Sequence, residues 1–192
     1  MARDEIVWVD SPAAPPPEAH LPERHPDAIP VGEMMPAHYD QCYGCGREHP
    51  GGLRLQVVAG DLSIHATFEV TDAHQGAPGL AHGGLLATAF DEALGALNWL
   101  LMAPAVTARL ETDFRKPVPV GSVLHIDAEI VGISGRKVYT RGVARIGLEG
   151  PVALTARAMF VQVGLEHFIE HGDAEVVRSQ ALRRGANIEV NP

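Results

Sequence analysis

The residues best suited to chemistry lie in one apolar segment, residues 79–98, which reads GLAHGGLLATAFDEALGALN. Between Gly83 and Leu100 the only charged residues are the adjacent Asp91 and Glu92, and most of the others are Leu, Ala, Phe or Gly. A carboxylate within a largely apolar helix must find a partner, shift its pKa or take part in a reaction. Asp91 is therefore a candidate base or nucleophile, and the alternative is a structural buried acid.

The start of the same helix supplies hydrogen-bond donors. His82 is followed by Gly83 and Gly84, and two glycines allow another group to approach the backbone closely. The first N–H groups of a helix have no acceptor within it and lie at the positive end of its dipole. They are suited to polarising a carbonyl group that docks against them.

The distance between these two features constrains how they can act together. Gly83 and Asp91 are eight residues apart, which corresponds to roughly 12 Å along a helix at 1.5 Å per residue. One helix therefore cannot easily direct both groups at the same carbonyl. Two antiparallel copies of the helix could do so, and a two-fold homodimer would contain two such sites. We expect a composite site and an obligatory dimer.

Composition narrows the class of protein. The chain has 192 residues, is 46% hydrophobic and carries a net charge of −9, which suits one globular domain and argues against nucleic acid as a partner. No apolar leader follows Met1, and the apolar run from Ala93 to Ala108 is broken by Asn98 and Pro104. We therefore predict no signal peptide, no membrane span and a cytoplasmic location.

The two cysteines, Cys42 and Cys45, lie between His38 and His49 in the segment HYDQCYGCGREH. Four such residues could in principle bind zinc, but a Cys-x-x-Cys turn usually supplies only half of a zinc site and no other Cys exists in the chain. We favour a Gly-rich turn with two small apolar thiols. The sequence prediction is therefore that no metal is bound.

The flanking segments alternate between apolar and polar residues with the period of a β-strand. Two predicted strands precede the helix, with a loop at 74–79, and four follow it after Pro104. Short turns between the later strands favour antiparallel pairing. An antiparallel sheet wrapped around one long central helix satisfies this order, an α+β architecture. The predicted strands cover residues 51–58, 62–70, 106–114, 122–132, 137–146 and 152–163.

The chain divides into three parts by composition. Residues 1–37 form a Pro-rich N-terminal arm, because eight of the 15 prolines lie within residues 1–36. Residues 38–163 hold the predicted domain. Residues 164–192 form a polar C-terminal tail with a helix predicted at 175–184.

Several motifs in the right order resemble the hotdog-fold acyl-CoA thioesterases. The most specific is His82-Gly83-Gly84 followed by Asp91, nine residues after the His. The closest likeness is to the branch that contains the phenylacetyl-CoA-pathway thioesterases and thioesterase superfamily member 4, and it covers residues 40–163. The supporting motifs are CYGCGREHPGGLRL (42–55), HQGAPGLA (74–81), FRKPVPVGS (114–122) and GRK (135–137).

The resemblance implies a role for each matching residue. Asp91 matches the catalytic carboxylate, and Gly83 matches the glycine whose N–H polarises the thioester carbonyl. His82 matches the motif histidine, which helps to place the carbonyl or braces the loop. Thr107 matches a hydroxyl residue that positions water or the carboxylate. The implied coenzyme A contacts are Arg115, Lys116, Arg136 and Lys137.

The implied activity is hydrolysis of acyl-CoA to a free acid and coenzyme A, with Asp91 as base or nucleophile. No cofactor is implied, and the expected partners are the acyl-CoA substrate and a second copy of the chain, with a dimer of dimers as a larger option. The main alternative is a hotdog module that binds acyl-CoA or another apolar ligand without turnover. A hydratase-type hotdog enzyme and a structural dimer with a vestigial site are further alternatives.

Overall fold

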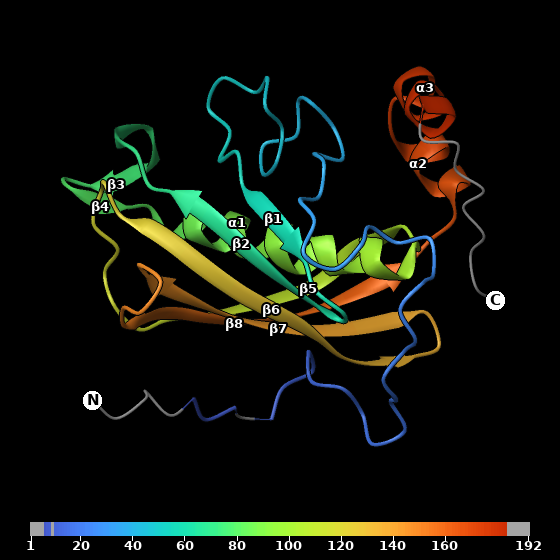
Figure 1. The fold of residues 1–192 in the computed structure, drawn as a ribbon, viewed down its shortest axis with the longest axis horizontal. Helices are drawn as coiled ribbons and strands as arrows, with labels where there is room; N and C mark the ends of the chain where they lie inside the picture. The colour runs from blue at the N-terminus through green and yellow to red at the C-terminus, as the bar shows by residue number, and fades with distance from the viewer. Residues whose placement is uncertain (1–5, 9, 184–192) are drawn as a thin grey trace.

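An antiparallel sheet curved around one helix forms the centre of the protein (Figure 1). The computed structural model describes residues 6–8 and 10–183. In this part of the chain a 6-stranded sheet has the order β1-β2-β6-β7-β8-β5, with every neighbouring pair antiparallel. Its strands are β1 (Gln56–Ala59), β2 (Ser63–Glu69), β5 (Ala105–Phe114), β6 (Val123–Ser134), β7 (Lys137–Ile146) and β8 (Val152–Gln162). The predicted architecture is confirmed.

Strand alternation turns one face of this sheet toward helix α1 (Gly83–Ala96), which continues as the short 3-10 helix η2 (Leu97–Leu101). In β6 the side chains of Leu124, Ile126, Ala128 and Ile130 are buried against the core, while the intervening residues are more exposed. Full burial of each large apolar side chain contributes about 1.5–3 kcal/mol. The sheet face and the inner face of α1 therefore hold each other in place.

Phe90 shows how closely the helix fits the sheet. Its ring is 1% exposed and lies over Gly142 of β7, where an added Cβ would come within 3.1 Å of the ring. A side chain at position 142 would crowd the Phe90 ring, which would have to move by a few tenths of an ångström. Gly142 thus leaves room for Phe90, the residue before Asp91, and lets the middle of α1 lie close to β7.

Two segments differ from the sequence prediction. The expected loop at 74–79 follows a 3-10 helix, η1 (Asp72–His74), and forms a small hairpin of β3 (Gln75–Ala77) and β4 (Leu80–Ala81), turned at Gly79 with φ 76°. Strand β1 starts at Gln56 rather than at residue 51. The residues before it bond to the loop that contains Cys42 and Cys45 (residues 38–49, the cysteine loop) instead of to the sheet. The N–H groups of Leu53 and Leu55 donate to the carbonyls of Tyr43 and Gly44.

The N-terminal arm, as far as it is described, lies along the outer face of the sheet. His20 exchanges two backbone hydrogen bonds with Ile133 of β6. The ring of Trp8 lies 5.6 Å from the guanidinium of Arg141 and 4.7 Å from that of Arg157, distances at which a cation is attracted to an indole face. The proline-rich composition is therefore compatible with a docked arm.

The arm also covers one edge of the sheet. The N–H of Met35 donates to Val57, the N–H of Ala59 donates to Glu33, and the N–H of Gly32 donates to Ala59. These bonds satisfy the outer side of β1, which would otherwise present unpaired backbone groups. The opposite edge of the sheet, strand β5, has no such cover within the described residues.

Strand β5 is a long edge with unusual exposure. Among the described residues it pairs only with β8, and Thr107, Ala108 and Arg109 are exposed along it. Phe114 at its end is 54% exposed. Long uncovered edge strands are ready to pair with another chain, so natural proteins usually shield them. Strand β5 is therefore the edge at which a second copy could add its own strand.

The C-terminal tail contains two helices rather than the single predicted one. These are α2 (Leu165–His171) and α3 (Ala174–Arg183), and Arg184, the predicted end of the helix, lies outside the described residues. None of the helices in the described ranges is long and apolar enough to cross a bilayer. The cytoplasmic location stays a prediction.

Candidate functional site

The start of α1 is organised by His82. The His82 Nδ1 accepts a hydrogen bond from the N–H of Gly84 at 2.9 Å, and the His82 carbonyl accepts from Leu85 and Leu86. In the part of the chain that the structure describes, the N–H of Gly83 is assigned no acceptor. This amide is the available donor at the positive end of the helix, as the sequence predicts.

Two neighbours hold His82 in its capping position. Its N–H donates to the carbonyl of His74 at 2.8 Å, and its ring packs over Gly76, where an added Cβ would come within 2.8 Å of the ring and the Cα of His82. His74 is 4% exposed, and burial lowers the pKa of its imidazole. These contacts give His82 a bracing role. A second role toward substrate stays a prediction.

Asp91 lies further along α1, on the side of the helix that faces β5. The hydroxyl of Thr107 donates to Asp91 Oδ1 at 2.8 Å. Strand β5 thus holds one of the two carboxylate oxygens in a fixed direction. The structure therefore brings together two residues that the sequence resemblance paired only by inference.

The flank that carries Asp91 is less buried than the sequence suggests. Leu86, Phe90 and Leu94 are buried toward the sheet, whereas Thr88 and Asp91 on the other side are half-buried and Gly84 is exposed. In a single chain, the small and polar side of α1 therefore opens next to the uncovered edge of β5.

Gly83 and Asp91 do not converge within one chain. Strand β5 runs antiparallel to α1, because the ring of Phe114 lies beside Gly83 whereas Thr107 bonds to Asp91. The two candidate groups are therefore separated by roughly 12 Å of helix. Gly83 and Asp91 both lie beside strand β5, the uncovered edge of the sheet in the described residues.

The predicted coenzyme A contacts fall into two groups at opposite ends of the sheet. Arg115 and Lys116 follow the end of β5, where their N–H groups donate to the carbonyl of Ala153 in β8, and both side chains are exposed. Arg136 lies in the β6–β7 turn and Lys137 is the first residue of β7. The Nη1 of Arg136 donates to the carbonyl of Gln162 at 3.2 Å. Seven residues of β8 separate the two ends, or roughly 23 Å. One chain therefore cannot bring all four to one phosphate group.

Two hollows in the surface lie away from these residues. One, of about 500 Å³, lies between Trp8 and the outer face of β2, β6 and β7. The other, of about 430 Å³, is lined by the 50–56 segment, by residues of β2 and by His74. Neither is lined by Asp91, Gly83 or Thr107.

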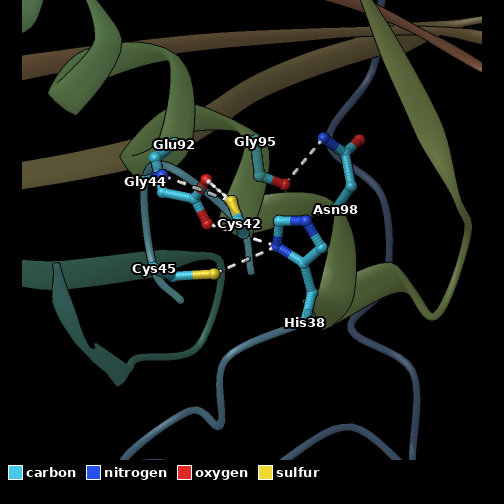
Figure 2. Close-up of polar contacts among 7 residues, drawn as sticks. All are labelled: His38, Cys42, Gly44, Cys45, Glu92, Gly95 and Asn98. Carbon is cyan, nitrogen blue, oxygen red and sulfur yellow. Dashed lines mark hydrogen bonds and ion pairs between the residues drawn. The ribbon is translucent and has the colours of Figure 1, made fainter. Parts of the chain in front are cut away.

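A second cluster of reactive side chains lies where the loop before β1 meets α1 (Figure 2). His38, Cys42 and Cys45 come from the loop before β1, and Glu92 comes from the helix. The hydrogen bond between Cys45 and Cys42 raises the pKa of the Cys45 thiol, and burial raises it further. The same hydrogen bond, together with a hydrogen bond from His38, lowers the pKa of Cys42 to about 3. Hydrogen bonds to Cys42 and Glu92 raise the pKa of His38 to about 10.

Sequence reasoning did not assign Glu92 to this cluster. The Glu92 carboxylate lies 3.4 Å from His38, and its side chain is 15% exposed. His49, the fourth candidate zinc ligand in the sequence, instead packs its ring against Tyr43. No local pattern connects Glu92 to a loop that starts about fifty residues earlier, so only the fold could reveal this contact.

The sequence of this chain is similar to that of a known protein family over part of its length. The sequence profile of the thioesterase superfamily matches residues 78–147, a range that contains His82, Gly83, Asp91 and Thr107. The acyl-coenzyme A thioesterase THEM4 of Xenopus laevis is 36% identical over 89 residues, which cover 46% of this chain and 40% of that protein. The match thus spans two fifths of the length of this curated relative.

Solved structures show the same architecture. A crystal structure of a thioesterase superfamily protein aligns with a TM-score of 0.56 and 30% identity, covering 60% of each chain. A hypothetical thioesterase protein with coenzyme A from Streptococcus pneumoniae aligns with a TM-score of 0.54 and 22% identity over 57% of this chain and 89% of that one. At that identity the second alignment shows a shared fold alone.

Proposed function

Because this chain carries a thioesterase superfamily domain with the hotdog fold, we propose that it hydrolyses the thioester of acyl-coenzyme A to a free acid and coenzyme A. The observation that carries the proposal is the Thr107–Asp91 hydrogen bond at 2.8 Å, on the flank of α1 beside an uncovered edge strand. This bond orients a carboxylate toward a surface where the substrate carbonyl can approach.

The reaction needs an activated nucleophile and a donor for the carbonyl oxygen. As a base, Asp91 takes a proton from water while the water oxygen attacks the thioester carbon. As a nucleophile, it attacks directly and forms an anhydride that water then cleaves. In either route the Gly83 N–H stabilises the negative charge on the carbonyl oxygen, and the coenzyme A thiolate leaves and takes up a proton.

A two-fold copy would bring the donor and the carboxylate together. If Leu110 of one β5 lies opposite Glu111 of the other, antiparallel pairing places Thr107 opposite the partner's Phe114. Asp91 would then face the partner's Gly83, because each lies beside one of these two β5 residues. The half-buried and exposed flank of α1 beside the edge strand β5 supports this composite site.

The same pairing would gather the basic residues. It brings the Arg115–Lys116 end of one β5 toward the β6–β7 turn of the other chain, where Arg136 lies and Lys137 begins β7. Four cations from two chains could then contact the phosphates of one coenzyme A, which a single chain cannot arrange over roughly 23 Å.

Hydrolysis itself is tested by measuring thiol release over a panel of acyl-CoA substrates, short to long and aliphatic to aromatic. Cleavage of at least one member at a rate above the buffer rate is expected. Saturable binding of the panel without release of thiol from any member would reject the enzyme and favour a binding module.

Removal of the Thr107 hydroxyl should slow the reaction without changing the fold. Thr107→Val keeps the shape of the side chain but leaves Asp91 without its orienting donor, so we expect kcat to fall about tenfold, which corresponds to about 1.4 kcal/mol. Thr107→Ser retains the hydroxyl and should keep most of the activity. Equal rates for the two variants would show that the hydroxyl does not orient the carboxylate.

Loss of a basic side chain should weaken binding of the nucleotide part of the substrate. For Arg115→Ala and Arg136→Ala we expect KM for acyl-CoA to rise about fivefold with kcat nearly unchanged. The matched substrate is the N-acetylcysteamine thioester of the same acid, which lacks phosphates and should show no change. Arg47→Ala, in the exposed part of the cysteine loop, serves as the control for net charge. An equal KM change with both substrates would contradict a phosphate contact.

A further inference from the structure

The cluster beside α1 contains four side chains that can each donate one ligand atom. The ligand atoms of His38, Cys42, Cys45 and Glu92 all lie within 4.8 Å of one another (Figure 2). Cys45 Sγ is 3.1 Å from His38 Nδ1, Cys42 Sγ is 3.3 Å from Glu92 Oε2, and His38 Nδ1 is 3.4 Å from Glu92 Oε1. A tetrahedral zinc ion with Zn–S near 2.3 Å and Zn–N near 2.0 Å requires ligand separations of roughly 3.3–3.8 Å.

The loop has the backbone needed to present two thiols to one point. The N–H of Gly44 points at Cys42 Sγ at 3.3 Å, and the N–H of Gly46 donates to the Cys42 carbonyl at 2.9 Å. A Cβ at Gly44 would collide with the Glu92 carboxylate, and a Cβ at Gly46 would collide with the carbonyls of Asp40 and Cys42. Both glycines are thus required for the turn to close over the helix.

We propose that His38, Cys42, Cys45 and Glu92 bind one zinc ion, which fastens the loop before β1 to helix α1. Two thiolates, an imidazole and a carboxylate form a donor set that zinc accepts. Because all four donors come from the protein, the site has no open position for substrate and is structural. This proposal does not depend on the proposed hydrolysis.

The acidic character of the cluster also favours a cation. On binding zinc both thiols would release their protons, because the thiolate is the form that binds a metal. The two thiolates and the Glu92 carboxylate would then surround the ion with negative charge, in a cluster whose cysteines are half-buried and buried. A disulfide between Cys42 and Cys45 would remove two of the charges but would not explain why His38 and Glu92 point at the same place.

The proposed metal would connect distant parts of the chain. The cysteine loop bonds to Leu53 and Leu55 just before β1, and Glu92 is the residue after Asp91. The ion would therefore fix the entry to the sheet against the middle of α1. Structural zinc contributes directly to folding free energy, so removal of the metal should lower Tm by about 5–10 °C.

The direct test is metal content of the full chain, purified without a histidine tag or chelator and analysed by inductively coupled plasma mass spectrometry. About one zinc per chain is expected for the wild type, and less than about one tenth for Cys42→Ser/Cys45→Ser. The matched pair is His38→Ala, which should lose the metal, and His49→Ala in the same loop, which should keep it. Equal zinc content in the two His variants would overturn the ligand assignment.

A second measurement remains valid if the variants fold poorly. Wild-type protein stripped with a chelator is titrated with Co²⁺, and sulfur ligands should produce a near-ultraviolet charge-transfer band that saturates at one equivalent and is displaced by Zn²⁺. Its Tm should rise again on metal addition. No Co²⁺ or Zn²⁺ binding at micromolar concentration, or a mass two hydrogens lower from a Cys42–Cys45 disulfide in protein kept under reducing conditions, would overturn the proposal.

Discussion

Asp91→Asn is expected to lower kcat for acyl-CoA hydrolysis by about 10³-fold, within the range that loss of a catalytic base or nucleophile produces. The amide is nearly the same size as the carboxylate, and its oxygen can still accept the hydrogen bond from Thr107 that the wild type makes at 2.8 Å. Neither the position of the side chain nor the packing of α1 should change. Thiol release at saturating acyl-CoA measures the loss, and circular dichroism and Tm show that the fold persists.

The matched control is Asp61→Asn, an equal change at an exposed turn between β1 and β2. It alters net charge by the same amount but lies on a different element from Asp91, so kcat should stay within about twofold of the wild type. Activity of Asp91→Asn close to that of Asp61→Asn would remove Asp91 from the mechanism. The proposed zinc site would be unaffected by this outcome, because its test is metal content.

Local patterns predicted the elements that depend on local physics. The alternation of buried and exposed residues along β6 follows from the period of a strand, and the apolar character of α1 follows from its burial against the sheet. Pairing of Thr107 with Asp91 required the family resemblance, because sixteen residues and a turn separate them. The resemblance names both residues and the structure adds their contact, while their catalytic roles stay a prediction.

Contacts between distant segments could not be predicted in the same way. The prolines of the arm are typical of an extended segment, but composition contains no information about the β6 residue that His20 would bond to. Glu92 meets Cys42 and Cys45 only because Gly44 lets the loop lie directly on the helix. The β3–β4 hairpin was missed since its strands are only three and two residues long and lack an alternating pattern.

Gly83→Pro should reduce kcat by about 10²–10³-fold, the effect of removing one oxyanion donor. Gly83 is the first residue of α1, a position at which proline is well tolerated. His82 before it has φ −70° and ψ 131°, the extended conformation that a residue before proline prefers. The substitution therefore deletes the N–H with little disturbance of the helix. Gly83→Ala keeps the N–H and places its Cβ 3.5 Å from the Phe114 ring, an ordinary contact, so it should remain active.

Combining the two inactive variants tests whether the site is shared between chains. Asp91→Asn and Gly83→Pro are co-expressed with different tags, and the mixed dimer is isolated by two affinity steps. If Asp91 of one chain acts with the partner's Gly83, one site of the mixed dimer contains both changes and the other contains neither. The mixed dimer should then recover about half of the wild-type activity. If both groups acted within one chain, each site would contain one defect and the mixed dimer would stay as inactive as its parents.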